Sequence, residues 1–204
     1  MFPKRIVAVE GVVHSGKTTL CTTLRGQPFL ADNIHFLPEY SAYAKDLGGF
    51  PVCPMTSVEA LKSLVFFLRL EERRFRSIPQ DVGLVVLDRS VLSLLAFDYA
   101  LERFYGSKMK VFQETLRRVN HEWIPEVCLY LEISDETQMA RHGFDNFHYE
   151  PLLLDPGFNA YLREFYSRIR YYFPRIEMVR INGESPPGEI LAKTQLVITS
   201  FVAG

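Results

Sequence analysis

The sequence has few cysteines, no long apolar run and no excess of charge of one sign. Its three cysteines, Cys21, Cys53 and Cys128, are far apart, so they form neither a disulfide framework nor the spacing of a metal site. We therefore expect a reducing, cytoplasmic location. No apolar run approaches the length of a membrane span, and the first residues lead directly into a strand. We expect neither a signal peptide nor a transmembrane segment.

The balance of charge excludes one broad class of partner. The formal net charge is −1 over 204 residues, which argues against electrostatic binding of nucleic acid as the main role. Apolar residues make up 48% of the chain and charged residues 23%, which is ordinary for a globular protein. The length fits one domain, or one domain with a small insertion, and allows a large core.

Apolar runs of strand length alternate with helix-like segments along the chain. The predicted strands cover residues 5–10, 34–37, 83–88, 127–133 and 176–181. The predicted helices cover residues 16–25, 56–76, 91–103, 108–121, 134–141 and 157–173, with a last helix from Pro186. This alternation predicts an α/β fold of three layers, with a five-stranded parallel sheet and helices on both faces. We expect residues 41–55 to form a mobile or substrate-facing loop and residues 142–156 to form a flap.

The most specific motif is Gly11-Val-Val-His-Ser-Gly-Lys-Thr18, which follows a buried strand and opens a helix. The spacing G-x-x-x-x-G-K-T is the Walker A pattern, in which backbone N–H groups and a helix N-terminus surround phosphate oxygens. The lysine reaches the β- and γ-phosphates, and the threonine hydroxyl holds Mg²⁺. The sequence therefore predicts a nucleotide-phosphate site formed by Gly11, His14, Ser15, Gly16, Lys17, Thr18 and Thr19.

Further polar residues follow other predicted strands and belong at the same edge of the sheet. Asp88 ends the run Leu84–Leu87, a position from which a carboxylate can hold Mg²⁺ together with Thr18. Arg89 offers a planar fork for phosphate, although a salt bridge would also explain it. Glu39 follows the second strand and could act as a general base, or be a solvated loop acid.

Arg141 lies at the end of a short helix, where the flap begins. It could close over the phosphates and neutralise the transferred charge, or it could simply lie at the negative end of its own helix dipole. We expect Arg73, Arg74 and Arg76 at a solvated helix end. Aromatic residues at helical spacing are most simply core residues, although some could line a slot for a flat ring, namely Tyr40, Tyr43, Phe66, Phe67, Phe97 and Tyr99.

Taken together, these motifs resemble the thymidylate kinase and deoxynucleoside kinase superfamily of P-loop proteins. The resemblance rests on residues 9–19, Pro38-Glu-Tyr40, Leu87-Asp-Arg-Ser90, residues 125–133, Arg141, Arg180-Ile-Asn182 and Pro186-Pro187. It implies a single P-loop kinase domain over residues 1–204, a lid near residues 142–156, ATP and Mg²⁺ as cofactors, and a homodimer. It also implies that Glu39 is the base, that Arg89 contacts the acceptor and the transferred phosphate, and that Arg141 is the first lid arginine.

Three features depart from the family pattern. Residues 142–148 lack the usual cluster of lid arginines, and no glutamine occurs on the helix before the Asp-Arg-Ser triplet, where Lys62 and Ser63 stand. The triplet also begins with aspartate, where the nucleoside branch commonly has glutamate.

These observations favour an ATP- and Mg²⁺-dependent phosphotransferase with a small acceptor, a nucleoside or nucleoside monophosphate. Glu39 favours a hydroxyl acceptor, because a monophosphate is already anionic and needs no base. Two alternatives stay open at this point. One is a kinase of the same fold for a non-nucleoside metabolite or antibiotic, and the other is a regulatory protein that hydrolyses its nucleotide slowly. No Asn-Lys-x-Asp stretch occurs in the sequence, which disfavours a GTPase.

Overall fold

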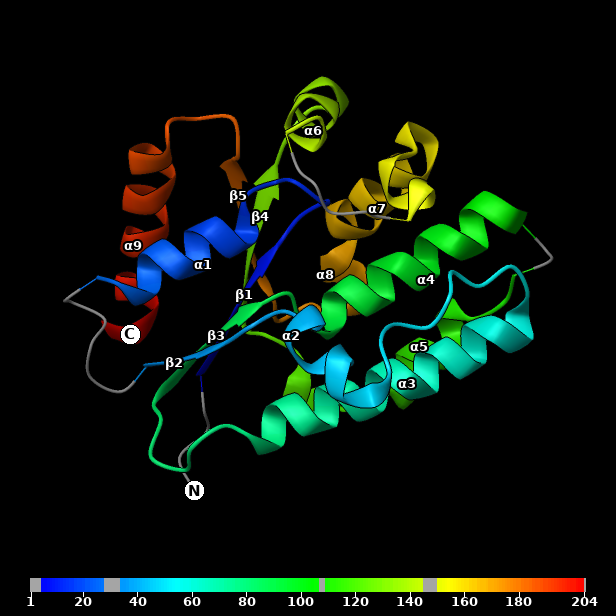
Figure 1. Ribbon diagram of the computed structural model, residues 1–204. Coiled ribbons are helices and arrows are strands. Elements are labelled where there is room, and N and C mark those ends of the chain that lie inside the picture. Colours follow the sequence, from blue (N-terminus) through cyan, green and yellow to red (C-terminus); the bar gives the residue numbers. More distant parts are fainter. Residues whose placement is uncertain (1–4, 28–33, 107–108, 145–149, 204) are drawn as a thin grey trace.

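A parallel sheet of five strands lies at the centre of the computed structural model, which describes residues 5–27, 34–106, 109–144 and 150–203 (Figure 1). The strands are β1 (Arg5–Glu10), β2 (Ile34–Leu37), β3 (Leu84–Asp88), β4 (Val127–Glu132) and β5 (Glu177–Asn182). Their order across the sheet is β2-β3-β1-β4-β5, and neighbouring strands are parallel. The predicted α/β fold is confirmed.

Helices cover both faces of this sheet. Figure 1 shows α1 (Lys17–Arg25) and α9 (Pro187–Ala203) on one side. The other side carries α3 (Ser57–Arg76), α4 (Val91–Tyr105), α5 (Phe112–Arg118), α7 (Pro156–Ser167) and α8 (Ile169–Tyr172). Strand β1 shows why both faces of the sheet are covered, because successive side chains of a strand point to opposite faces and those of β1 are apolar on both. Val7 and Val9 pack in one core with α1 and α9, whereas Ile6 and Ala8 pack in another.

Local capping fixes where several helices begin. Thr56 caps α3 through a full capping box with Glu59, in which each side chain accepts the other residue's backbone N–H. Ser90 caps α4 and accepts from the N–H of Leu92, and Ser134 caps α6 (Asp135–His142) in the same way. Such a cap contributes roughly 1 kcal/mol. The predicted starts of these three helices are confirmed to within one residue.

The structure differs from the sequence prediction in three segments. Residues 41–55, predicted as loop, begin with a helical turn, α2 (Ser41–Ala44), followed by the 3-10 turn η2 (Lys45–Leu47). Within the segment 108–121, predicted as one helix, residue 108 lies outside the described residues and the observed helix α5 covers only Phe112–Arg118. It ends there because the backbone at Val119 is extended, and the 3-10 turn η4 (His121–Trp123) follows. The helix predicted for residues 157–173 is broken into α7 and α8 at Arg168, whose φ of −103° and ψ of 6° leave the helical region.

The predicted flap is described only in part. Residues 145–149 of the predicted lid lie outside the described residues. The segment after them contains a 3-10 turn, η5 (Pro151–Leu154), and then Asp155, whose side chain caps α7. None of the helices in the described ranges combines the length and the apolar character that crossing a membrane requires.

Candidate active site

The loop between β1 and α1 requires glycine for both steric and conformational reasons. Gly11 has a φ of +145°, and a Cβ there would lie 2.6 Å from the carbonyl oxygen of Leu131 and 2.7 Å from Oγ of Ser15. Gly16 has a φ of +95° and precedes the first residue of α1 without a side-chain cap. The first N–H groups of α1 are thus presented at the end of the loop, and a helix start of this kind favours anions. His14 also adopts a positive φ, of 63°.

Lys17 folds back onto this loop. Its Nζ donates to the carbonyl oxygen of Val12 at 2.6 Å and to Oγ of Ser15 at 3.1 Å. Burial and the nearby charge of Arg89 lower the pKa of Lys17 to about 7, against the opposing effect of Asp88. A phosphate group at the loop would restore the charge of this amine, because an anion stabilises the ammonium form.

Asp88 lies beside the start of the loop because β3 pairs with β1 and places Asp88 opposite Val9. Its carboxylate is 3% exposed, and Oδ1 is buried with no hydrogen-bond partner among the described residues. Burial raises the pKa of Asp88, although a hydrogen bond with Thr18 opposes the rise. A buried carboxylate oxygen without a partner, next to a threonine hydroxyl, suits a hard cation such as Mg²⁺. Thr19 is exposed on the first turn of α1.

Glu39 and Arg89 form an ion pair next to the same loop. Nε of Arg89 lies 3.4 Å from Oε2 of Glu39, and Nη1 of Arg89 donates to the carbonyl oxygen of Gly11 and to Oγ of Ser93, both at 3.3 Å. Ser41 donates to Oε1 of Glu39 at 2.7 Å. Burial raises the pKa of Glu39, but the charge of Arg89 and the hydrogen bond from Ser41 outweigh it and lower the pKa overall. Glu39 is therefore an anion at neutral pH.

Arg141, at the end of α6, reaches the phosphate loop rather than only the end of its own helix. Its Nη1 donates to the carbonyl oxygen of His14 at 3.1 Å, and its Nη2 donates to the carbonyl oxygen of Gly183 at 2.8 Å. The next residue, His142, lies with Nδ1 3.2 Å from Nε2 of His14. The structure thus brings the end of α6 onto the predicted phosphate site.

Two buried charged residues next to these groups were not expected from the sequence. Glu10, fully buried at the end of β1, accepts hydrogen bonds from the N–H and Oγ of Ser90, from Oγ of Ser93 and from the hydroxyl of Tyr166. The sequence contained a signal for Glu10, because a charged residue at the end of a buried parallel strand needs several hydrogen-bond partners.

Arg74 corrects the prediction of a solvated helix end. Arg73 and Arg76 are exposed, as expected, but the side chain of Arg74 has 0% exposure and pairs with Glu71, also at 0%. Its position in the helical repeat was the missed signal, since the buried residues of α3 are Ala60, Ser63, Leu64, Leu70, Glu71 and Arg74.

The aromatic residues divide between core and site. Tyr99 is a core residue that packs against Phe112 and Phe165. Tyr40 is buried next to Phe67, with ring centroids 5.6 Å apart, directly after Glu39.

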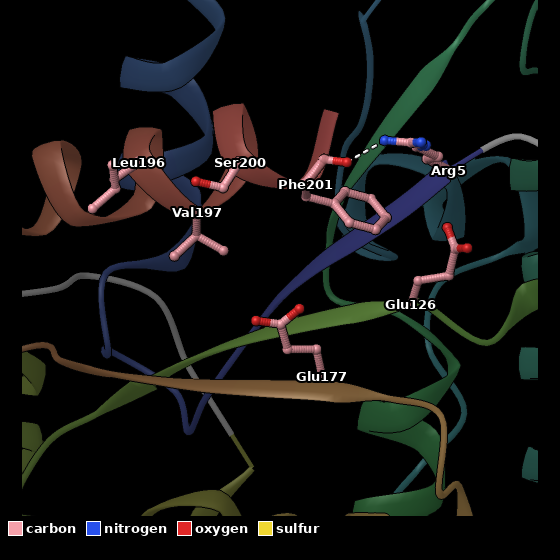
Figure 2. A pocket seen from close by; sticks show the side chains of 7 residues that line it. All are labelled: Arg5, Glu126, Glu177, Leu196, Val197, Ser200 and Phe201. Carbon is pink, nitrogen blue, oxygen red and sulfur yellow. Dashed lines mark hydrogen bonds between the residues drawn. The ribbon is translucent and has the colours of Figure 1, made fainter. Parts of the chain in front are cut away.

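A groove of about 530 Å³ lies at the other end of the sheet (Figure 2). It is lined by the first residue of β1, the first residue of β5 and the last turns of α9, and Arg5 donates a hydrogen bond to the carbonyl oxygen of Phe201 across it. None of the predicted site residues lines this groove. Ligands of open parallel sheets bind at the carboxyl ends of the strands, so the loop edge is the better candidate.

Solved structures that share this fold include a deoxyadenosine kinase and a thymidylate kinase. A deoxyadenosine kinase from M. mycoides with bound dCTP is 14% identical, with a TM-score of 0.67 over 96% of this chain and 99% of that chain. The same kinase with bound dATP is 18% identical, with a TM-score of 0.66 over 96% and 99%. A thymidylate kinase from Candida albicans is 15% identical, with a TM-score of 0.70 over 97% and 92%.

No family model matches the sequence, and no curated protein matches it. Because the identity to these structures is low, the likeness concerns the fold. The chain shares the fold of these deoxyadenosine and thymidylate kinases.

Proposed function

We propose that this protein is an ATP- and Mg²⁺-dependent kinase that transfers the γ-phosphate to a hydroxyl of a small acceptor, a nucleoside in the first instance. The observation that carries the proposal is the ion pair between Glu39 and Arg89 beside the glycine loop. A carboxylate and a guanidinium lie there next to the predicted phosphate site, and these groups suit a base and a phosphate contact. The fold shared with deoxyadenosine and thymidylate kinases supports the same reaction class.

In this proposal each residue has one task. The backbone N–H groups of residues 11–19 and Lys17 bind the phosphates of ATP. Asp88 and Thr18 would hold Mg²⁺, which would neutralise charge on the phosphate oxygens. Glu39 accepts the proton of the acceptor hydroxyl as that oxygen attacks the γ-phosphorus, and ADP leaves. Arg89 and Arg141 stabilise the charge on the transferred group, since phosphoryl transfer depends mainly on positioning and electrostatics.

The lid, the domain extent, the location and the assembly stay predictions. We propose that residues 1–204 act as one kinase domain and that residues 142–156 close over the nucleotide. Helix α3 exposes Val58, Leu61 and Val65 at helical spacing, with exposed fractions of 63%, 37% and 40%, which supports the predicted homodimer. Sedimentation velocity tests this, and a monomer at all concentrations would contradict it. The three free thiols agree with a cytoplasmic location.

The decisive assay is ADP release with Mg²⁺-ATP, measured with and without a panel of nucleosides, nucleoside monophosphates and other metabolites. The proposal predicts turnover that depends on a nucleoside and is lost in Lys17→Ala. Turnover that depends only on a monophosphate or a non-nucleoside metabolite would contradict the acceptor assignment. Slow turnover that no acceptor changes would contradict the kinase assignment and indicate a nucleotide-hydrolysing regulator.

A further inference from the structure

The guanidinium of Arg74 is the centre of a buried polar cluster between α3 and the candidate site. Its side chain is completely buried, and Nη1 lies 2.5 Å from Oε2 of Glu71, which is also completely buried. The guanidinium carbon lies 4.4 Å from the centre of the Tyr40 ring. A cation held in this way has one fixed orientation, because both its charge partner and its flat face are occupied.

The other side of the same guanidinium joins two segments of the candidate site. Nη2 donates to the carbonyl oxygens of Pro38 at 3.0 Å, Asp88 at 3.3 Å and Arg89 at 2.9 Å. Pro38 directly precedes Glu39, so one side chain from α3 connects the backbone that carries the predicted base to the backbone that carries the predicted metal ligand and phosphate contact.

The turn that Arg74 holds has a backbone conformation that needs support. Arg89 has a φ of +62°, in the left-handed region, which costs a non-glycine residue roughly 1–2 kcal/mol. In the same turn, the N–H and Oγ of Ser90 donate to Glu10 at 2.8 and 2.7 Å. The triplet Asp88–Ser90 is therefore fixed between a buried cation and a buried anion.

The stability of the fold alone is a weak reason for burying the ion pair between Arg74 and Glu71. A buried ion pair contributes little more to folding than apolar side chains of similar volume, and replacing the whole pair is often neutral or stabilising. The geometry gives a stronger reason, because the forked donors of arginine can bind several carbonyl oxygens and a carboxylate at once. Lysine, with one ammonium group, cannot reproduce this arrangement.

We infer that Arg74 is a positioning residue for phosphoryl transfer, which sets the separation between the carboxylate of Glu39 and the turn Asp88–Arg89. This inference rests on the proposed function, and it assigns Arg74 no contact with nucleotide or acceptor.

The test compares three variants with wild-type protein. Arg74→Lys keeps the charge next to Glu71 but loses the fork, and the double variant Glu71→Met/Arg74→Met removes the pair while filling its volume. Arg73→Lys is the matched control. Arg73 lies one position earlier on α3, and its half-exposed side chain pairs with Asp46 at the surface. Thermal unfolding reports the fold, and kcat is expressed per nucleotide-binding site, so that loss of folded protein does not lower it.

Arg74→Lys and the double variant should lower kcat by about 10- to 100-fold, the effect of a misplacement near 1 Å, with KM for ATP little changed. The control should match wild-type protein. Adding Glu39→Gln to Arg74→Lys should cost less than the product of the two separate losses, because Arg74 acts through Glu39. Variants with wild-type kcat, or fully multiplicative losses with Glu39→Gln, would overturn the inference.

The proposed function and this inference fail in different ways. If wild-type protein shows no acceptor-dependent transfer, the proposed function is wrong. Arg74 is then judged by the Mg²⁺ concentration that half-saturates binding of a fluorescent ATP analogue, because the position of Asp88 sets this value. An increase of about tenfold in Arg74→Lys, and none in Arg73→Lys, supports the positioning role. Equal values in all three proteins contradict it.

Discussion

Asp98 offers a quantitative test of the core next to the site. It lies on α4, is 3% exposed, and accepts a hydrogen bond from Oγ1 of Thr115 on α5 at 2.5 Å. Burial raises its pKa from 3.8 to about 7, and the negative charge of Glu102 adds to the effect. Between pH 3.8 and about 7, Asp98 is therefore protonated in the folded state and ionised in the unfolded state.

The sign and size follow from this difference. Where the folded state binds more protons than the unfolded state, the free energy of unfolding falls as pH rises, by about 1.4 kcal/mol per pH unit for one group. Between pH 5 and pH 8, Asp98 should thus remove about 3 kcal/mol from the stability of the wild-type protein. The variant Asp98→Asn has no titrating group at this position, and its amide oxygen can still accept the hydrogen bond from Thr115. Its stability should therefore not fall in this way as pH rises.

The assay is urea unfolding followed by the fluorescence of the single tryptophan, Trp123, at several pH values from 5 to 8. The stability of Asp98→Asn relative to wild-type protein should increase by about 3 kcal/mol over this range. Asp81→Asn, at an exposed position, is the control and should show no such trend. A difference between Asp98→Asn and wild-type protein that does not change with pH would refute the reasoning.

Three further predictions concern the site. Because the pKa of Lys17 is about 7 without ligand, ATP binding at pH 8 should be coupled to the uptake of close to one proton. Calorimetry in buffers of different ionisation enthalpy measures this uptake, and its absence would mean that the phosphates do not contact the Lys17 amine. Glu39→Gln should slow transfer to a hydroxyl by about 10²- to 10⁴-fold without weakening ATP binding, and an unchanged rate would remove Glu39 as the base. Asp88→Asn should raise the Mg²⁺ concentration needed for half-maximal nucleotide binding, whereas binding without Mg²⁺ should stay as in wild-type protein; an unchanged requirement would exclude Asp88 as a ligand.

Much of the fold could be predicted because its signals are local. Apolar runs such as Leu84–Leu87 specify buried parallel strands, and Thr56, Ser90 and Ser134 specify helix starts by hydrogen bonds within a few residues. The break at Arg168 could not be predicted, because apolar residues continue at helical spacing through it. The helical turn at residues 41–44 could not be predicted either, because the glycines and prolines that follow it are typical of a loop.

The candidate site was predictable where chemistry and strand ends coincide. Glu39 and Arg89 follow strands β2 and β3, Asp88 ends β3, and parallel pairing brings such positions to one edge. The supporting residues were harder to predict because their role depends on packing. Arg74 resembles its exposed neighbours in residue type. Its position in the helical repeat indicates burial, but its partners, Glu71 and the turn after β3, are seen only in the folded structure.

The most direct test of the central claim is a crystal structure with Mg²⁺, a non-hydrolysable ATP analogue and a deoxynucleoside. The account predicts phosphates at the N–H groups of residues 11–19, Mg²⁺ between Thr18 and Asp88, and an acceptor hydroxyl within hydrogen-bond distance of Glu39. Phosphates bound elsewhere, or an acceptor hydroxyl remote from Glu39, would contradict it.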